Sequence, residues 1–286
     1  ESVVADPMQV IADESIDAVL ICSPTDLHAE QIIAAAKAGK DIFCEKPIAN
    51  DIGKTRAALR AVEEAGVKLQ LGFNRRFDPN FKKVRELVQG GDVGDLHIVK
   101  ITSRDPAPPP ISYVKVSGGI FMDMTIHDFD MARYLTGSEV TEVFASGEVL
   151  IDPEIGKAGD YDSAVIVLKF ANKVTCVIDN SRQAAYGYDQ RVEVFGSKGS
   201  AVAYNKKPTD VEVSTEHAVC TDKPLYFFLE RYMESFAQEL KDFVSALASD
   251  GKPPVTGEDG LQSLYIAMAA TKSARENRPV PITEVI

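Results

Sequence analysis

The tripeptide Glu45-Lys46-Pro47 directly follows residues 41–44, a short segment with three successive apolar residues that is typical of a buried strand. In open α/β sheets, ligands bind beyond the carboxyl ends of the strands, so a side chain at this position is expected to face a ligand. A lysine ammonium placed there can orient a substrate hydroxyl and stabilise a developing alkoxide. The alternative interpretation of Lys46 is a solvated surface lysine.

A second group of polar residues lies within residues 118–130. If this segment is one helix, Asp123, His127 and Asp130 fall at i, i+4 and i+7 and share one stripe. An imidazole, with a reference pKa near ~6.5, can accept a hydroxyl proton at physiological pH. We therefore predict His127 as the base of an alcohol oxidation. Asp123 can fix the tautomer of the ring, favour the imidazolium, or hydrogen-bond the substrate hydroxyl.

Two other interpretations of this segment are open. Asp123 and His127 could be a surface pair, which would contribute only a few tenths of a kcal/mol. A metal site formed by Asp123, His127 and Asp130 is conceivable, but the sequence has no HExxH motif or Cys/His cluster, and we predict no metal. Asp128 interrupts the apolar stripe of the same helix, and the sequence does not identify its partner.

The first third of the chain alternates between strands and helices. Such alternation indicates βαβ units and a parallel sheet, so residues 1–95 are predicted to form an incomplete doubly wound Rossmann domain of the α/β class. The predicted strands are residues 18–22, 41–44 and 67–72, and the predicted helices are residues 28–38, 52–64 and 81–88.

The rest of the chain, residues 96–286, is predicted to be an α+β domain with a large open mixed or antiparallel sheet. Its strand candidates are residues 97–104, 140–149, 163–170, 173–182, 190–196, 199–204 and 210–214. Long helices are expected only at residues 119–135, 225–248 and 259–276, which suffice to cover one face, and the C-terminal ones could pack back on the first domain. An uncovered apolar face usually marks an interface, so we expect a homo-oligomer, either a dimer or a tetramer.

Composition excludes several classes of partner. The net charge of -12 would repel a nucleic acid backbone. No apolar run approaches the ~20 residues of a membrane span. The four cysteines form no CxxC pair, which favours a reducing cytoplasm.

Glu45-Lys46-Pro47, followed later by a GG-x-x-x-D-x-x-x-H-D segment at residues 118–128, resembles the paired signature of the Gfo/Idh/MocA oxidoreductases. The resemblance implies that Lys46, Asp123 and His127 form the catalytic set and that NAD is the cofactor. It also implies that the cofactor-binding residues are Ser23, Pro24, Thr25, His28, Glu45, Lys46 and Pro47.

Within the family, Asn74-Arg75-Arg76-Phe77-Asp78 and Ser103-Arg104-Asp105-Pro106 look most like the inositol 2-dehydrogenases. This resemblance implies that Arg76 and Tyr186 contact a polyol together with Lys46, Asp123 and His127. Asp130 would then support the helix or the substrate rim.

The sequence departs from the family in lacking a GxGxxG segment. That segment belongs to the opening βαβ unit, which we expect to precede Glu1, and its absence leaves NADP as an alternative to NAD. Another sugar or a dihydrodiol is the alternative substrate. The rival of a different class is a non-catalytic fragment or paralogue that acts as a sensor or subunit.

Overall fold

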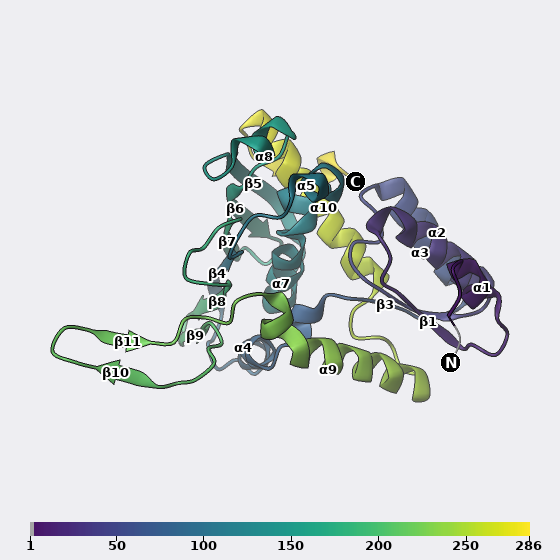
Figure 1. Ribbon diagram of the computed structural model, residues 1–286, viewed down its shortest axis with the longest axis horizontal. Helices are drawn as coiled ribbons and strands as arrows, with labels where there is room; N and C mark the ends of the chain where they lie inside the picture. Colours follow the sequence, from purple (N-terminus) through teal and green to yellow (C-terminus); the bar gives the residue numbers. More distant parts are fainter. Residues whose placement is uncertain (1–2) are drawn as a thin grey trace. The chain divides into compact units, whose positions relative to one another are not determined.

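A computed structural model describes residues 3–286, which fold as two compact units (Figure 1). Unit 1 comprises Glu1–Asn74 and Phe236–Tyr265, and unit 2 comprises Arg75–Ser235 and Ile266–Ile286. The first segment of unit 1 ends at Asn74, which is earlier in the chain than the predicted domain boundary at residue 95. The reason is that the helix α4 (Pro79–Gln89) packs on strands and a helix of unit 2.

Unit 1 contains a parallel three-stranded sheet in the order β1-β2-β3. Its strands are β1 (Ala18–Ile21), β2 (Asp41–Cys44) and β3 (Leu69–Leu71), and its helices are α1 (Pro7–Ala12), α2 (Thr25–Lys37) and α3 (Ile52–Ala65). Figure 1 shows α2 and α3 on one side of this sheet and the later turns of α9 (Phe228–Ala248) on the other. This arrangement confirms the predicted doubly wound, Rossmann-like α/β domain.

Local signals set the ends of α3. Asp51 caps the helix by accepting a hydrogen bond from the backbone amide of Lys54 at 2.8 Å. Gly66 ends the helix with a φ of 68°, a left-handed conformation that glycine adopts without steric cost. Because both signals are local, the sequence was sufficient to predict this element.

Unit 2 is built on a seven-stranded mixed sheet in the order β12-β5-β6-β7-β4-β8-β9. β4 pairs in parallel with β7 and antiparallel with β8, which confirms the predicted mixed sheet. The strands are β4 (Leu96–Arg104), β5 (Val140–Glu148), β6 (Ser163–Phe170), β7 (Thr175–Ser181), β8 (Asp189–Gly196), β9 (Gly199–Ala203) and β12 (Val280–Pro281).

One face of this sheet is covered by helices, and the other is not. In β4, Val99 and Ile101 are buried, whereas the alternating Ile98 is 40% exposed. The covered face packs on α7 (Ile126–Thr136) and on the second half of α10 (Gly257–Glu276), where the Ser273 hydroxyl accepts a hydrogen bond from the amide of Ala145 at 2.9 Å. The uncovered face mixes apolar side chains with charged pairs such as Lys100 and Glu193.

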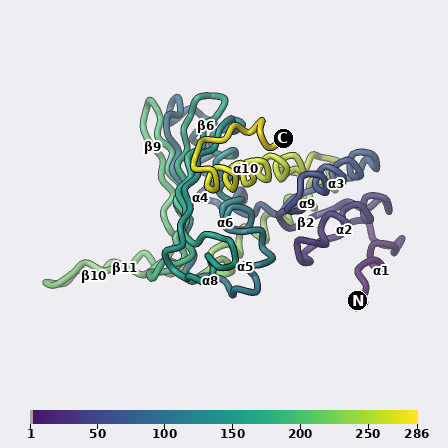
Figure 2. Tube along the Cα trace, turned by 90° about the horizontal axis from the view of Figure 1, so that it is seen from above, coloured from purple at the N-terminus to yellow at the C-terminus, as the bar shows by residue number. Residues whose placement is uncertain are grey.

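Figures 1 and 2 show a β-hairpin that extends away from the end of the seven-stranded sheet. It consists of β10 (Glu212–Ser214) and β11 (Val219–Thr221), and both strands are exposed along their length. The remaining elements are the short helices η1 (Asn74–Phe77), α5 (Ile111–Ser117), α6 (Ile120–Asp123), α8 (Pro153–Lys157) and η2 (Ile282–Glu284). Within residues 3–286, no helix combines the length and the apolarity that a membrane crossing requires.

The predicted single helix at residues 119–135 is wrong, because the structure divides it into α6 and α7. The amide of Thr125 bonds to the carbonyl of Ile120, five residues back, which widens the turn. The hydroxyl of Thr125 donates to Asn180 Oδ1 at 2.5 Å and holds the widened turn against β7. The predicted continuous stripe through Asp123, His127 and Asp130 is therefore interrupted at Thr125.

Asp162 organises the turn before α8. Its buried carboxylate accepts hydrogen bonds from the backbone amides of Leu150, Ile151 and Asp152 at 2.8, 2.8 and 3.0 Å. Burial by itself would raise the pKa of Asp162, but these amides bring the pKa below its ordinary value. The carboxylate therefore stabilises the fold only while it is ionised.

Asp162→Ala is expected to lower the free energy of unfolding by about 2–3 kcal/mol at pH 7, because buried amides lose a charged acceptor. A lowered pKa means that this stabilisation exists above the unfolded-state pKa and is lost as pH falls through the folded-state pKa. In urea unfolding, the difference in free energy of unfolding between the original protein and Asp162→Ala should therefore be smaller at pH 3 than at pH 7. Glu154→Gln, at an exposed position of the same segment, is the control and should change stability by less than ~0.5 kcal/mol. An equal loss in both variants would contradict this role.

Candidate active site

The loops that follow β1 and β2 in unit 1 are held together by His28. Its ring is almost fully buried, with Nε2 lying 2.7 Å from the carbonyl oxygen of Ser23 and Nδ1 lying 2.8 Å from that of Pro47. Ser23 in turn donates its hydroxyl to Gln31 Oε1 at 2.6 Å. Both His28 ring nitrogens thus face backbone oxygens, so its predicted cofactor role would consist of fixing these loops.

The start of α2 fits the polar groups of a nicotinamide cofactor. Pro24 occupies the N-cap position, and no side chain caps the helix. Uncapped amides in the first turn of a helix are hydrogen-bond donors for a polar ligand. Backbone groups at Pro24 and Thr25, with the loop of residues 45–47, would hold the cofactor.

Glu45 and Lys46 are half-buried at the carboxyl end of β2. Burial raises the pKa of Glu45, and the ammonium and backbone amide of Lys46 act in the opposite direction. A carboxylate that stays charged here can hold the backbone of Lys46 and favour its ammonium form. Lys46 therefore has the charged neighbour that an orienting lysine needs.

Asp123 in unit 2 is held by two side chains from other segments. Its Oδ1 accepts a hydrogen bond from the Tyr113 hydroxyl at 2.7 Å, and its Oδ2 accepts one from Arg182 Nη1 at 3.0 Å. The position of Asp123 at the end of α6 is thus fixed by α5 and by the end of β7. His127 lies in the first turn of α7, half-buried.

Arg182 joins Asp123 to a second carboxylate. Its side chain is only 3% exposed, and Nη1 lies 3.6 Å from Asp105 Oδ2. Burial raises the pKa of Asp105 to about 6, although Arg182 and Arg75 act to lower it. Arg182 could not be identified as a site residue from the sequence, because it stands at the end of a predicted strand and belongs to no motif.

The η1 segment supplies arginine partners for the two carboxylates of α7, Asp128 and Asp130. Arg75 Nη1 lies 2.5 Å from Asp128 Oδ1, and Asn180 Nδ2 donates to Asp128 Oδ2 at 2.9 Å. Arg76 binds Asp130 in a bidentate pair, with distances of 2.8 Å from Nε and 2.5 Å from Nη2. The ion pair with Arg76 agrees with a supporting role for Asp130. Two N–H groups of Arg76 are used in this pair and are not available to a substrate.

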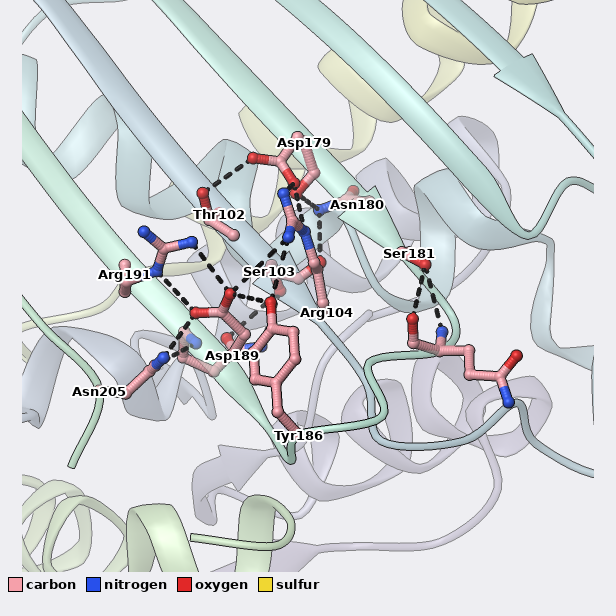
Figure 3. Close-up of polar contacts among 12 residues, drawn as sticks. Thr102, Ser103, Arg104, Asp179, Asn180, Ser181, Tyr186, Asp189, Arg191 and Asn205 are labelled. Atoms are coloured by element: carbon pink, nitrogen blue, oxygen red, sulfur yellow. Dashed lines mark hydrogen bonds and ion pairs between the residues drawn. The ribbon is translucent and has the colours of Figure 1, made fainter. Parts of the chain in front are cut away.

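Tyr186 takes part in a polar network at the start of β8 (Figure 3). Its hydroxyl donates to Asp189 Oδ2 at 2.6 Å and accepts from Arg104 Nη1 at 3.1 Å. Arg104 also binds Asp179 on the uncovered side of the sheet, at 2.6 Å from Nε to Oδ1. These contacts do not bring Tyr186 together with Asp123 and His127, and its role as a substrate contact stays a prediction.

Tyr113→Phe tests the importance of the hydrogen bond to Asp123. Loss of a hydrogen bond to a charged group costs about 1.5–3 kcal/mol, so kcat/KM should fall by roughly tenfold or more if Asp123 acts on the substrate or on His127. Tyr161→Phe, a change in a ring that packs on Phe121, is the control and should have little effect. Equal kinetics for Tyr113→Phe and the original protein would remove Tyr113 from the site.

Among residues 3–286, no group of three or more His, Cys, Asp or Glu side chains is arranged to hold a metal ion. The donor set of unit 2 is instead made of carboxylates that are bound to arginines. Asp123, Asp128 and Asp130 each form an ion pair with an arginine.

Two sequence matches cover most of the chain. Residues 1–73 match the oxidoreductase family with an NAD-binding Rossmann fold, and residues 81–202 match the C-terminal domain of the same Gfo/Idh/MocA family. The chain belongs to the Gfo/Idh/MocA oxidoreductases. The family expectation and the NAD-binding character of the first unit are thereby confirmed.

Named relatives are close in sequence and in structure. Myo-inositol 2-dehydrogenase from Thermotoga maritima is 54% identical over 286 residues, which cover 100% of this chain and 86% of the relative. A crystal structure of a probable dehydrogenase from Thermotoga maritima has a TM-score of 0.97 at 54% identity, covering 99% of this chain and 85% of that one. The crystal structure of scyllo-inositol dehydrogenase from Lactobacillus casei with NAD(H) and scyllo-inositol has a TM-score of 0.90 at 33% identity. The match covers 97% of this chain and 84% of that one.

Proposed function

We propose that this protein is an NAD-dependent inositol 2-dehydrogenase, which removes a hydride from a ring carbon of a cyclitol and leaves a ketone. The observation that carries the proposal is the 54% identity with a myo-inositol 2-dehydrogenase along the whole chain. The intact Lys46, Asp123 and His127 argue against the rival of a sensor or subunit without turnover.

The reaction breaks one C–H and one O–H bond of the substrate alcohol and forms a carbonyl. A bound nicotinamide supplies the hydride acceptor. His127 accepts the hydroxyl proton as general base. The Lys46 ammonium orients the same hydroxyl and stabilises negative charge as it develops on the oxygen. Asp123, fixed by Tyr113 and Arg182, orients the imidazole or hydrogen-bonds the substrate.

Arg76 and Tyr186 are the proposed contacts to the distal hydroxyls. The Tyr186 hydroxyl already donates its proton to Asp189. It can therefore only accept a further hydrogen bond, which suits a donating hydroxyl of a polyol. Arg76 would keep its pair with Asp130 and offer its remaining N–H groups.

We further propose that the uncovered face of the seven-stranded sheet pairs with other copies of the chain. Val165 and Phe195 on this face are 50% and 46% exposed, and they lie among charged side chains. Apolar side chains exposed together on one sheet face often mark an interface between protein chains. A dimer or tetramer in the cytoplasm is the expected form, and sedimentation at micromolar concentration tests it.

The substrate test is a panel of polyols assayed with NAD and with NADP. Myo-inositol with NAD should give the highest kcat/KM, with lower values for scyllo-inositol, glucose and a dihydrodiol. A sugar or dihydrodiol that exceeds every inositol would assign the alternative substrate. No turnover with any of them in a folded protein would favour the sensor or subunit.

A further inference from the structure

Glu45 shares one face of the unit 1 sheet with residues of the neighbouring strand β3. The register pairs Phe43 with Gln70, and two residues further on Glu45 lies beside Gly72. Alternation along the strands places all four on the same side. A Cβ on Gly72 would lie 2.9 Å from Glu45 Oε2, so the Glu45 carboxylate lies close against the backbone of Gly72.

The later turns of α9 cover this face. The rings of Phe43 and Phe243 are 5.9 Å apart, and Gln70 Nε2 donates to the backbone carbonyl of Glu239 at 2.8 Å. Glu239 lies in the buried stripe of the helix, one turn before Phe243, and is only 1% exposed. A carboxyl group therefore occupies a position where an amphipathic helix normally carries an apolar residue.

Two acceptor oxygens at this place have no donor among residues 3–286. They are Glu239 Oε2 and Gln70 Oε1, and both are buried. A buried acceptor without a donor is costly, whereas a protonated carboxyl group supplies an O–H. The Glu45 carboxylate nearby has the backbone amide of Lys46 as a donor. A single proton on Glu239 Oε2 would turn this atom into a donor, and one neighbouring acceptor, either Gln70 Oε1 or the Glu45 carboxylate, could accept its hydrogen bond.

We propose that Glu239 is a carboxylic acid in the active enzyme and forms, with the Glu45 carboxylate, a pair that positions Lys46. The inference rests on the proposed role of Lys46 in inositol oxidation. Glu239 is a positioning residue, because it acts on Lys46 only through Glu45. With Glu239 neutral, Glu45 is the single negative charge of the pair and can hold the backbone and the ammonium of Lys46.

The charges around the pair agree with this assignment. Burial, and then the charge of Glu45, raise the pKa of Glu239 to about 9. Cys22 also interacts with Glu239, and burial raises the pKa of its thiol, so the thiol adds no charge at neutral pH. Burial also raises the pKa of Glu45, but Lys46 and His28 act to lower it, whereas burial and the charge of Glu45 both raise the pKa of Glu239. The proton therefore resides on Glu239.

Infrared difference spectroscopy tests the proton directly and does not depend on turnover. Subtracting the spectrum of Glu239→Gln from that of the original protein at pH 7 should show the carbonyl band of a protonated carboxyl group. Glu234→Gln, an exposed change on the same helix, should leave this band in place. A spectrum without the band at pH 7 would overturn the proposal even if the protein oxidises inositol. The band in a protein that oxidises no inositol would support the pair and contradict the proposed function.

Kinetics test whether the pair positions Lys46. As the pH rises through the pKa of Glu239, a second negative charge arises beside Glu45, so kcat of the original protein should fall more steeply than that of Glu239→Gln. Glu239→Leu, which offers no donor, should lower kcat about tenfold at pH 7 with little change in KM, and Glu239→Gln should rescue most of this loss. Parallel pH profiles for the original protein and Glu239→Gln would overturn the positioning role.

Discussion

Replacing His127 by alanine is expected to lower kcat for inositol oxidation by roughly 10²–10⁴-fold, because proton transfer to a positioned side chain contributes that much. The residue stands in the first turn of α7, just after the break at Thr125, and its neighbours Phe129 and Ile126 are fully buried. The ring itself is half-buried, so the loss should appear in turnover while the melting temperature changes little.

The matched control is His217→Ala, a change in a histidine whose side chain is 84% exposed beyond β10. Steady-state rates at saturating inositol and NAD should be unchanged in this variant. Unaltered turnover in His127→Ala would remove His127 from the mechanism and leave Asp123 as a structural residue.

Lys46→Met is the second change with a large expected effect. The variant keeps an unbranched apolar chain that is one atom shorter and removes the ammonium, so kcat should fall by about 10²–10³-fold, as on loss of one preorganised donor to a developing oxyanion. Unfolding by urea should change little, because a half-buried methionine replaces the aliphatic part of the lysine.

Lys54→Met, on the exposed side of α3, is the control for Lys46→Met and should affect neither turnover nor stability. A collapse of folding in Lys46→Met, without a soluble protein to assay, would support a structural role of Lys46. Normal turnover would contradict its place in the catalytic set.

The elements with local signals could be predicted from the sequence. The cap at Asp51 and the left-handed Gly66 define α3, and the alternation in β6 and β7 marks strands with one buried face. The same reasoning located the loops after β1 and β2, because polar residues follow directly after short apolar runs.

The features that depend on distant residues could not be predicted. The break at Thr125 depends on Asn180, and the position of Asp123 depends on Arg182, both more than fifty residues away in the sequence. The buried Glu239 has the same origin, since periodicity alone assigns its helix face and cannot identify Gln70 as a neighbour. Only the first strand of the β10–β11 hairpin was predicted. The second strand, Val219–Thr221, consists of three exposed residues without the alternation of buried and exposed side chains that marks a strand.

The most direct test of the central claim follows the hydrogen itself. The purified protein is incubated with NAD and myo-inositol deuterated at carbon 2, and the mass of the reduced cofactor is measured. The reduced cofactor is expected to gain one deuterium, and the inositol is expected to become a ketone. Reduced cofactor without deuterium, or no reduced cofactor at all from a folded protein, would contradict hydride transfer from that ring carbon.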